Sequence, residues 1–422
     1  MRTSERGVLV GIVVAIGLAL RIAFVAVGDV QSPLRADAGQ YAQYAKNLVD
    51  HGTFSLASSV PPAPDSFRSP GYPLVLAACR WLAGETGWLP FAIALQVALG
   101  GITVLLVYRI ARGLGGFAPA LLAAALTAAS PHLVVSTAYV LTECVSTFLV
   151  ALAVWLLLGA QGTGRRVASA LVFGAAASCN ETLVVLPIAA ALAMWSRGRG
   201  ATLAWLALAL LPLGAWTLRN QLQPLALRGS ERATASISHG SYPGMVFRDP
   251  RLLGFPYRED PAQPAFGASW SGIADVLGPR IAAEPLRYAT WYVLEKPVWL
   301  WSWPLVQGRD VYVYDVANSP YERQPVMQAS RAVMRWLHVP VMLAGALAAA
   351  VCLWCRRRVG WQWTTLAAAV ALGTLAYVPV IPDPRYLQPL RPLVFVLAAV
   401  GGAAAIAWLA RRRPSAAPAV TA

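Results

Sequence analysis

The chain has 422 residues, of which 57% are hydrophobic and only 13% are charged. Soluble domains carry roughly a quarter charged residues, so this composition excludes an ordinary soluble protein and predicts an all-α polytopic membrane protein. The net charge of +15 would suggest nucleic-acid binding in a soluble chain. Here, however, the arginines lie in short clusters between apolar runs, which is the distribution that orients membrane helices. We therefore expect no nucleic-acid partner.

Apolar runs of suitable length predict about ten transmembrane helices. They cover residues 7–28, 89–109, 117–135, 141–160, 167–180, 182–196, 201–218, 336–355, 361–380 and 392–410. With these spans, the arginine clusters between the runs and at both chain ends fall on one side, which the positive-inside rule makes the cytoplasm. The first run has no small-residue cleavage site, so we interpret it as a retained helix. Both termini are then cytoplasmic.

Residues 167–196 allow two interpretations. Two short apolar runs flank Ser178–Thr182, and they form either two tilted spans or one long kinked helix. A single span would invert every later segment and break the arginine pattern, so we expect two.

The opposite face of the membrane receives the first outer loop, residues 29–88, together with 219–335 and 381–391. Within the first loop, residues 71–87 are too short to span and are expected to lie in the interface, with Trp81 and Trp88 as anchors. The predicted division of the chain is a transmembrane module at 1–218, a small folded extramembrane region at 219–335, C-terminal transmembrane helices at 336–413 and a disordered tail at 414–422.

Several polar and aromatic side chains on this outer face have two interpretations. The tryptophans of the extramembrane region either line a sugar or lipid groove or anchor the chain at the interface; they are Trp291, Trp299, Trp301 and Trp303. Glu143 and Glu181 lie in or between apolar runs, where a charge costs about 3 kcal/mol or more. Each of these acids either contacts a substrate or is a hydrogen-bonded carboxylate that braces the loops.

A series of short motifs in one order resembles the GT-C polyprenyl-phosphate-sugar glycosyltransferases, in particular the bacterial relatives of protein O-mannosyltransferases and lipid A aminoarabinose transferases. The matching residues are Asp37 with Tyr41 and Ala45–Leu48, Gly52–Phe54, Arg68–Pro73, Gln96, Thr142–Glu143, Trp216 with Arg219–Asn220, and Arg385–Pro389. The resemblance covers most of the chain. It departs from the family at Ala38, where many members have a second acid after the aspartate, and in its short extramembrane region.

This resemblance implies a GT-C-like bundle in the bacterial inner (plasma) membrane with the active site on the periplasmic side. The reaction would be inverting transfer of a sugar from a polyprenyl-phosphate donor to a hydroxyl of a lipid, glycan or protein acceptor. Such transfer needs a carboxylate to take the acceptor proton and cations to stabilise the departing phosphate. Asp37 is the expected base. An alternative for Asp37 is a structural helix cap near Ala38.

The expected phosphate-binding cations are Arg68, Arg219, Lys296 and Arg385, because arginine binds phosphate through two parallel hydrogen bonds. Each could instead contact lipid headgroups or a local acid such as Asp383 or Glu295. Tyr41, Tyr72, Glu143, Glu181 and Tyr386 complete the expected substrate-binding set. The sequence has no Asp-x-Asp motif and no histidine cluster, so we expect no required metal or cofactor, although a carboxylate-bound divalent ion stays open.

Two other classes of protein fit the topology. A transporter or flippase of a lipid-linked glycan would show inverted repeats and broken helices at mid-membrane depth, whereas the polar residues here gather at one face. A non-catalytic envelope assembly protein would tolerate the loss of Asp37.

Overall fold

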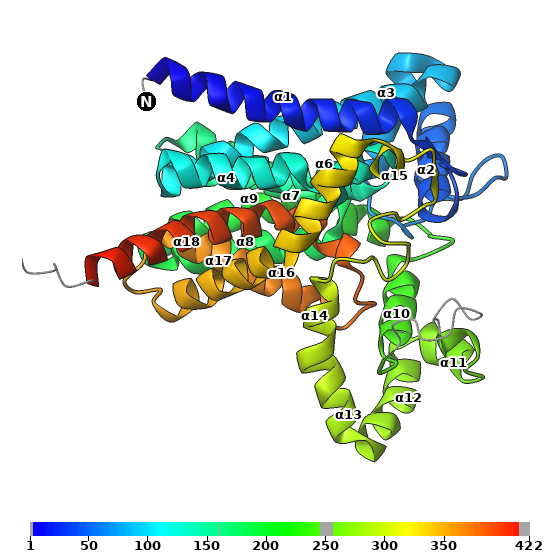
Figure 1. The fold of residues 1–422 in the computed structure, drawn as a ribbon. Helices are drawn as coiled ribbons and strands as arrows, with labels where there is room; N and C mark the ends of the chain where they lie inside the picture. The colour runs from blue at the N-terminus through cyan, green and yellow to red at the C-terminus, as the bar shows by residue number, and fades with distance from the viewer. Residues whose placement is uncertain (1–2, 160, 245–255, 413–422) are drawn as a thin grey trace, which may run out of the picture.

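The computed structural model describes residues 3–159, 161–244 and 256–412, and these form an almost entirely helical molecule (Figure 1). The long helices run side by side in one bundle, and the N-terminus and the end of the last helix lie at the same end of it. The bundle consists of α1 (Thr3–Val27), α3 (Gly71–Leu114), α4 (Phe117–Ala129), α6 (Thr142–Leu158), α7 (Thr163–Cys179), α8 (Val185–Met194), α9 (Arg199–Leu222), α16 (Pro325–Trp354), α17 (Trp361–Tyr377) and α18 (Arg391–Arg412). A helix is therefore present in each predicted apolar run, and the expected all-α fold class is confirmed.

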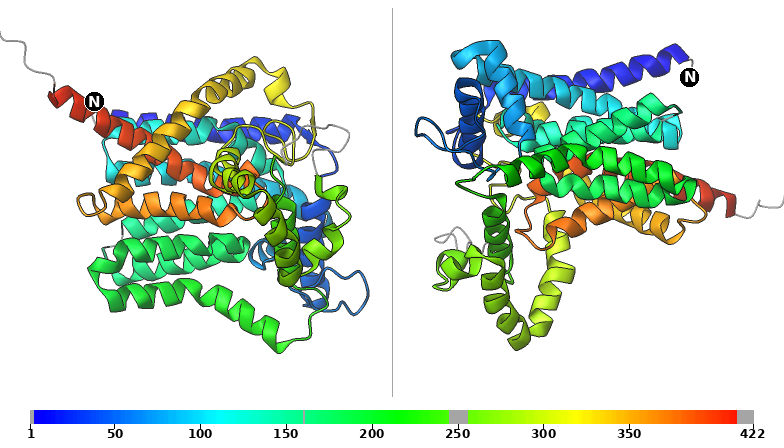
Figure 2. Two further views of the ribbon diagram at one scale, coloured as in Figure 1. Left: turned by 90° about the horizontal axis from the view of Figure 1, so that it is seen from below. Right: turned by 180° about the vertical axis from the view of Figure 1, so that it is seen from behind.

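The connecting segments at the other end of the bundle, called the outer end below, hold most of the shorter elements (Figures 1 and 2). The helices there are α2 (Ala36–His51), α5 (Pro131–Val135), η1 (Ser136–Ala138), η2 (Glu181–Val184), α10 (Gly229–Gly240), η5 (Pro256–Arg258), α11 (Gln263–Ala268), α12 (Trp270–Ala283), α13 (Pro285–Thr290), the π-helical η6 (Trp291–Glu295), α14 (Lys296–Leu300), α15 (Pro320–Arg323) and η7 (Pro384–Leu390). Two short strands, β1 (Asp29–Val30) and β2 (Val316–Ala317), pair antiparallel. A further short helix, η3 (Trp195–Arg197), connects α8 to α9.

The two runs within 167–196 form separate antiparallel segments. Asn180 ends α7, and its side chain accepts a hydrogen bond from the backbone N–H of Thr182. The Trp205 indole at the start of α9 donates to the carbonyl of Arg166 at the start of α7. Near the same level, Thr202 donates to the carbonyl of Met194 at the end of α8. The chain therefore reverses direction between α7 and α8, so residues 167–196 form two segments, as expected.

Helix α3 joins the predicted interfacial segment to the second predicted span. The two parts are separated at Gly84, whose φ of 72° and ψ of −179° interrupt the helical backbone. A positive φ is accessible to glycine because it has no Cβ. Trp81 is 75% exposed, as an interfacial anchor would be, but Trp88 is buried among apolar side chains. The expectation that Trp88 is an anchor is therefore wrong, since the bundle covers it.

Helix length and composition alone give fewer membrane crossings than the ten predicted from the sequence. Among the described residues, five helices are long and apolar enough to cross, or six if the bent pair at residues 117–138 is one span. Helices α6, α7 and α17 have 17 residues each, and α8 has ten. The five long apolar helices make the chain a multi-pass membrane protein, and ten crossings stay a prediction.

Two helix ends differ slightly from the predicted segment boundaries. Helix α9 continues to Leu222, and α16 begins at Pro325, before the predicted span at 336. The described residues between them form mostly short helices and loops. Residues 245–255 lie outside the described residues. The predicted tail at 414–422 also lies outside the described residues.

Candidate active site

Asp37 lies in the first turn of α2 and contacts two arginines that are far apart in the sequence. One carboxylate oxygen, Oδ1, is 2.5 Å from Nη2 of Arg68, and the other, Oδ2, is 3.1 Å from Nη2 of Arg385. The arginine side chains are only 10% and 11% exposed, whereas the aspartate is 27% exposed. The carboxylate therefore neutralises two nearly buried cations and still has an accessible edge.

Asp37 is not a helix cap. The N-cap residue of α2 is Arg35, and no side chain caps the helix there. Both carboxylate oxygens of Asp37 instead accept hydrogen bonds from guanidinium groups. The capping alternative is therefore wrong, because both oxygens of this side chain bond to arginines.

Arg68 is positioned by the segment that precedes it. Asp65, which is buried, accepts a hydrogen bond from the Tyr44 hydroxyl and others from the backbone N–H groups of Leu56 and Phe67. These bonds tie the irregular segment between α2 and α3 onto α2. At its end, Arg68 Nε donates to Gln40 Oε1 at 2.7 Å, and its guanidinium lies 5.2 Å from the centre of the Tyr41 ring.

Arg385 is positioned by a capped turn before the last helix. The buried side chain of Asp383 accepts hydrogen bonds from the backbone N–H groups of Arg385 and Gln307, at 3.0 and 2.8 Å. Asp383 therefore acts as the cap of η7 and not as an ion-pair partner for the Arg385 guanidinium. The adjacent Tyr386 ring lies under that guanidinium, 5.1 Å from its centre, and the Tyr386 hydroxyl donates to Gln307.

Glu143, in the first turn of α6, adds a second carboxylate. Its Oε1 is 4.0 Å from Arg385 Nε. The side chain is 10% exposed, and both Glu143 Oε2 and Arg385 Nε are buried without a hydrogen-bond partner. Buried polar atoms of a native protein are normally paired. Asp37, Arg68, Arg385 and Glu143, called the Asp37 cluster below, thus include one donor and one acceptor that are unused.

Tyr41 and Tyr72 form the floor beside the Asp37 cluster. Their rings meet edge to face at 5.2 Å, and the Tyr72 hydroxyl donates to Gln96 Oε1. The Gln96 amide in turn donates to the carbonyls of Thr137 and Tyr139. These hydrogen bonds hold Tyr72 in place, and the ring contact with Tyr72 holds Tyr41. Both tyrosines were expected to contact substrate.

Glu181 lies at the rim of the site and pairs with Arg232 of α10. Arg232 also donates to the carbonyl of Phe67, the neighbour of Arg68, at 3.0 Å. The bracing alternative for Glu181 therefore matches the geometry. Sequence reasoning missed Arg232, because an arginine in a polar extramembrane stretch has no pattern that distinguishes it from a solvated residue.

The structure does not bring Arg219 into the Asp37 cluster. Its guanidinium donates to the carbonyl of Asp65 at 2.7 Å and to the neighbouring Asn220, and it stacks at 4.8 Å from the centre of Trp216. Arg219 thus supports the irregular segment that carries Arg68.

Lys296 is also separate from the Asp37 cluster. It is fully buried, and its Nζ lies 2.7, 3.2 and 2.9 Å from the carbonyl oxygens of Val378, Pro379 and Val380, to which it donates. Burial lowers the pKa of Lys296 to about 6. Since a lysine has at most three N–H donors, this clamp leaves none of them for a ligand. Its partners are backbone carbonyls and not Glu295.

The electrostatics of the cluster keep Asp37 ionised. Burial alone would raise the pKa of its carboxyl, but the charges of Arg385 and Arg68 and their hydrogen bonds outweigh burial and lower the pKa to about 2. An opposite charge within hydrogen-bonding distance favours the ionised form in this way. Asp37 is therefore deprotonated, and both of its oxygens are occupied by arginines.

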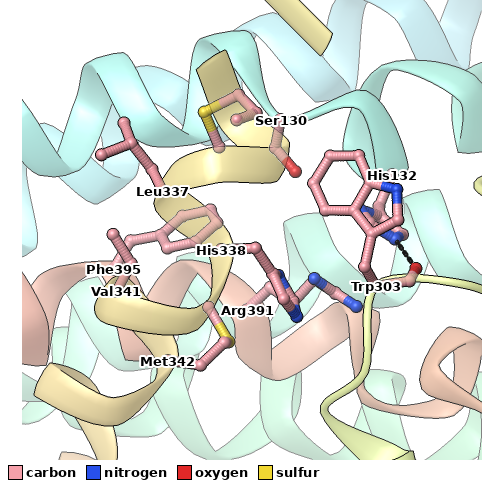
Figure 3. Close-up of a pocket in the computed structure, with 10 residues that line it drawn as sticks. Ser130, His132, Trp303, Leu337, His338, Val341, Met342, Arg391 and Phe395 are labelled. Carbon is pink, nitrogen blue, oxygen red and sulfur yellow. Dashed lines mark hydrogen bonds between the residues drawn. The ribbon is translucent and has the colours of Figure 1, made fainter. Parts of the chain in front are cut away.

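A pocket in the bundle lies apart from the Asp37 cluster (Figure 3). His132 and His338 face it, and Arg391 reaches it from the start of α18, with Nη2 3.2 Å from the Ser302 carbonyl. His132 Nε2 is 2.7 Å from the Trp303 carbonyl. None of the predicted site residues lines this pocket. Among the described residues there is no group of three or more His, Cys, Asp and Glu side chains placed to hold a metal ion.

Comparison with known proteins bears on this geometry. Residues 67–218 match the family model described as dolichyl-phosphate-mannose-protein mannosyltransferase. No curated protein matches the sequence closely enough to count as a relative. Two solved structures of the oligosaccharyltransferase AglB from Archaeoglobus fulgidus, one with an inhibitory peptide and a dolichol-phosphate and one tethered to an acceptor peptide, each have a TM-score of 0.51. The chain has a GT-C fold.

The sequence identities to AglB are 13% and 14%, with 97% and 98% of this chain and 51% of AglB covered. The chain thus spans about half the length of AglB, and the likeness establishes the fold only. ArnT from Cupriavidus metallidurans, solved with undecaprenyl phosphate, is 16% identical with a TM-score of 0.40, over 98% of this chain and 82% of ArnT. The resemblance inferred from the motifs is confirmed by the family model and the fold.

Proposed function

We propose that the protein is an inverting glycosyltransferase that moves a sugar from a polyprenyl-phosphate donor to an acceptor hydroxyl at the outer end of the bundle. The observation that carries this proposal is Asp37 held between Arg68 and Arg385. One carboxylate and two nearly buried cations are the groups that the reaction needs, and they meet in a GT-C fold. The family match and the donor lipids named for AglB and ArnT support a lipid-phosphate donor.

In the proposed reaction, the acceptor oxygen attacks the anomeric carbon while its proton passes to Asp37. The bond from the anomeric carbon to the phosphate oxygen breaks, and its electron pair leaves on the polyprenyl phosphate. Arg68 and Arg385 bind that phosphate and stabilise the charge that develops on it. Attack from the face opposite the phosphate inverts the anomeric configuration.

The same arginines cannot fully serve Asp37 and the phosphate at once. In the donor-free protein they lower the pKa of Asp37 to about 2, which makes it a weak base. A donor phosphate that draws the guanidinium groups away would raise that pKa and strengthen the base. Donor binding is therefore proposed to activate Asp37.

The accessible edge of Asp37 is where the acceptor hydroxyl would approach. Glu143 Oε2 and Arg385 Nε, both buried and unpartnered, are proposed to hydrogen-bond the sugar or phosphate. Tyr41, Tyr72 and Tyr386 are proposed to contact the donor around them, and Glu181 with Arg232 to form the rim. Arg219 and Lys296 are proposed to support the site and not to bind substrate.

The test is release of polyprenyl phosphate from a panel of labelled lipid-linked sugars by the purified protein. Time-dependent release with transfer of the label to an acceptor, and an inverted anomeric configuration by NMR, would support the proposal. Movement of intact donor across a vesicle bilayer without cleavage would instead support a flippase.

The proposed orientation has a separate test. Cytoplasmic termini place α10 on the periplasmic face, so a cysteine introduced at Ser230 should react with an impermeant thiol reagent added from that side. Reaction only from the cytoplasm would contradict the proposed active face.

A further inference from the structure

Residues 285–300 form one helical rod with two different faces, called the arm below. It comprises α13, η6 and α14, and its backbone stays helical through the junctions at Trp291 and Lys296. The face toward the protein is buried through Tyr288, Trp291, Lys296 and Leu300. Their spacing of three to five residues is that of one side of a helix.

The opposite face of the arm is apolar and bare. Leu286 is 83% exposed, Val293 68%, Leu294 62% and Val298 70%. The exposed Ala289 and the half-buried Pro297 lie between them, so they form a continuous stripe. The charged pair Glu284 and Arg287, joined at 2.8 Å, lies beside the end of the stripe. A stripe of this kind marks an interaction surface, because soluble surfaces rarely expose contiguous apolar patches.

The depth of the arm in the membrane is set relative to helix α16, whose two exposed tryptophans mark the boundaries of the bilayer. Trp336 and Trp354 of α16 are 85% and 90% exposed. They are 18 residues apart in that helix, or roughly 27 Å at 1.5 Å per residue. This is close to the hydrocarbon thickness of a bilayer, about 30 Å, and tryptophans gather at its two boundaries. Trp336 therefore marks the outer boundary.

The end of the arm lies at this boundary. His338, two residues after Trp336, has its Nε2 2.8 Å from the carbonyl of Trp301. The Trp301 indole donates to Thr374 near the end of α17, and Lys296 clamps the carbonyls just beyond that end. Figures 1 and 2 show the arm leaving the bundle from this point, across the direction of the bundle helices. Its long axis thus runs along the membrane plane.

We propose that the arm lies in the outer headgroup interface of the bilayer, with the stripe of Leu286, Val293, Leu294 and Val298 in contact with lipid acyl chains. Lipid is the occupant because the stripe begins where the lipid-facing surface of the bundle ends. Interfacial helices bind by burying an apolar face at the headgroup boundary. Helix α14 of the arm also packs against η7, so lipid contact would hold the turn that carries Arg385.

The test uses nitroxide labels on the full-length protein in phosphatidylethanolamine and phosphatidylglycerol bilayers. Four of the five native cysteines are buried, so Cys355→Ser provides a background with little labelling. Single cysteines then replace Leu286, Val293 or Val298, with Arg287→Cys as the control beside the stripe and Leu347→Cys, 67% exposed on α16, as the lipid-facing reference. Accessibility to oxygen, which partitions into lipid, is compared with accessibility to a water-soluble nickel chelate.

The expected result is an oxygen-to-nickel ratio at the three stripe positions several-fold higher than at Arg287 and approaching that at Leu347. Ratios equal to that at Arg287 would show an arm surrounded by water. Low accessibility to both reagents would show a stripe covered by protein, such as a second copy. A high ratio at Arg287 as well would show an arm fully embedded in lipid. Each of these three results would overturn the proposal.

Discussion

Two buried basic sites at the outer end of the bundle differ in the groups to which their N–H donors bond. At Lys296, three backbone carbonyls surround Nζ and leave none of its N–H groups for a ligand. In the Asp37 cluster, two arginines share one partly exposed carboxylate, and Arg385 Nε has no hydrogen-bond partner. Carbonyls at a helix end cannot leave without unfolding it, whereas a carboxylate can be exchanged for a phosphate. A basic residue near a membrane face is thus a plausible anion site only where its partner can be displaced.

The largest expected effect comes from Asp37→Asn. The amide cannot accept a proton at neutral pH, so turnover should fall by about two orders of magnitude or more. The measurement is the rate of polyprenyl-phosphate release at saturating donor. Asp50→Asn is the matched control, because Asp50 is on the same helix, at the surface, and pairs with Lys46. Turnover near wild type in Asp37→Asn would remove the base assignment and direct attention to Glu143.

Asp37→Asn should also lower stability. Breaking a buried ion pair costs roughly 3–5 kcal/mol, and the partial exposure of Asp37 reduces this to about 2 kcal/mol. Thermal unfolding in detergent measures the change and must accompany every kinetic comparison.

The second expected effect is on donor binding. Arg68→Gln and Arg385→Gln each remove a charge-assisted contact of roughly 1.5–3 kcal/mol, so donor affinity should fall about ten- to a hundredfold. Arg309→Gln is the control, since Arg309 is 66% exposed and pairs at the surface with Glu322. Unchanged donor affinity in both folded variants would eliminate the proposed phosphate site.

At Lys296 we expect a loss of stability without a loss of affinity for the sugar donor, the opposite of the result expected for Arg68 and Arg385. Lys296→Met removes the clamp on the end of α17 and leaves three carbonyls without donors, so unfolding should occur at a lower temperature. The affinity of the folded fraction for the sugar donor should change less than about threefold, because no N–H group of Lys296 is available to a ligand. A tenfold loss of affinity with normal stability would show that Lys296 binds the donor after all.

A smaller effect is expected in the pH dependence. Because the pKa of Asp37 is lowered in the folded protein, ionised Asp37 stabilises the folded state at pH values above the ordinary carboxyl pKa of 3.8. This contribution to stability is lost as the pH falls toward about 2. The kcat/KM profile reports the donor-free enzyme, and the kcat profile reports the complex. The acid limb of the kcat profile should therefore lie at a higher pH than the acid limb of the kcat/KM profile, by about one unit or more. Coincident limbs would argue that the phosphate does not compete for the arginines.

The sequence predicted the helices and named all four residues of the Asp37 cluster as candidates, for a physical reason. Apolar length and arginine placement report directly on membrane crossing, and a carboxylate near Arg68 in a short outer loop is costly enough to be informative. Whether Lys296 or Arg385 reaches Asp37 depends instead on how η7 and α14 dock, which no local pattern encodes. Arg232 was missed for the same reason, and Trp88 was misplaced because helix packing decides which face is covered.

The most direct test of the account is donor affinity in Asp37→Asn, measured by calorimetry with a lipid-linked sugar that wild type cleaves. If Asp37 competes with the phosphate for Arg68 and Arg385, the neutral amide should release both arginines. The account predicts donor binding equal to or several-fold tighter than wild type, together with the loss of turnover. Donor binding at least tenfold weaker, in protein shown to be folded, would contradict it.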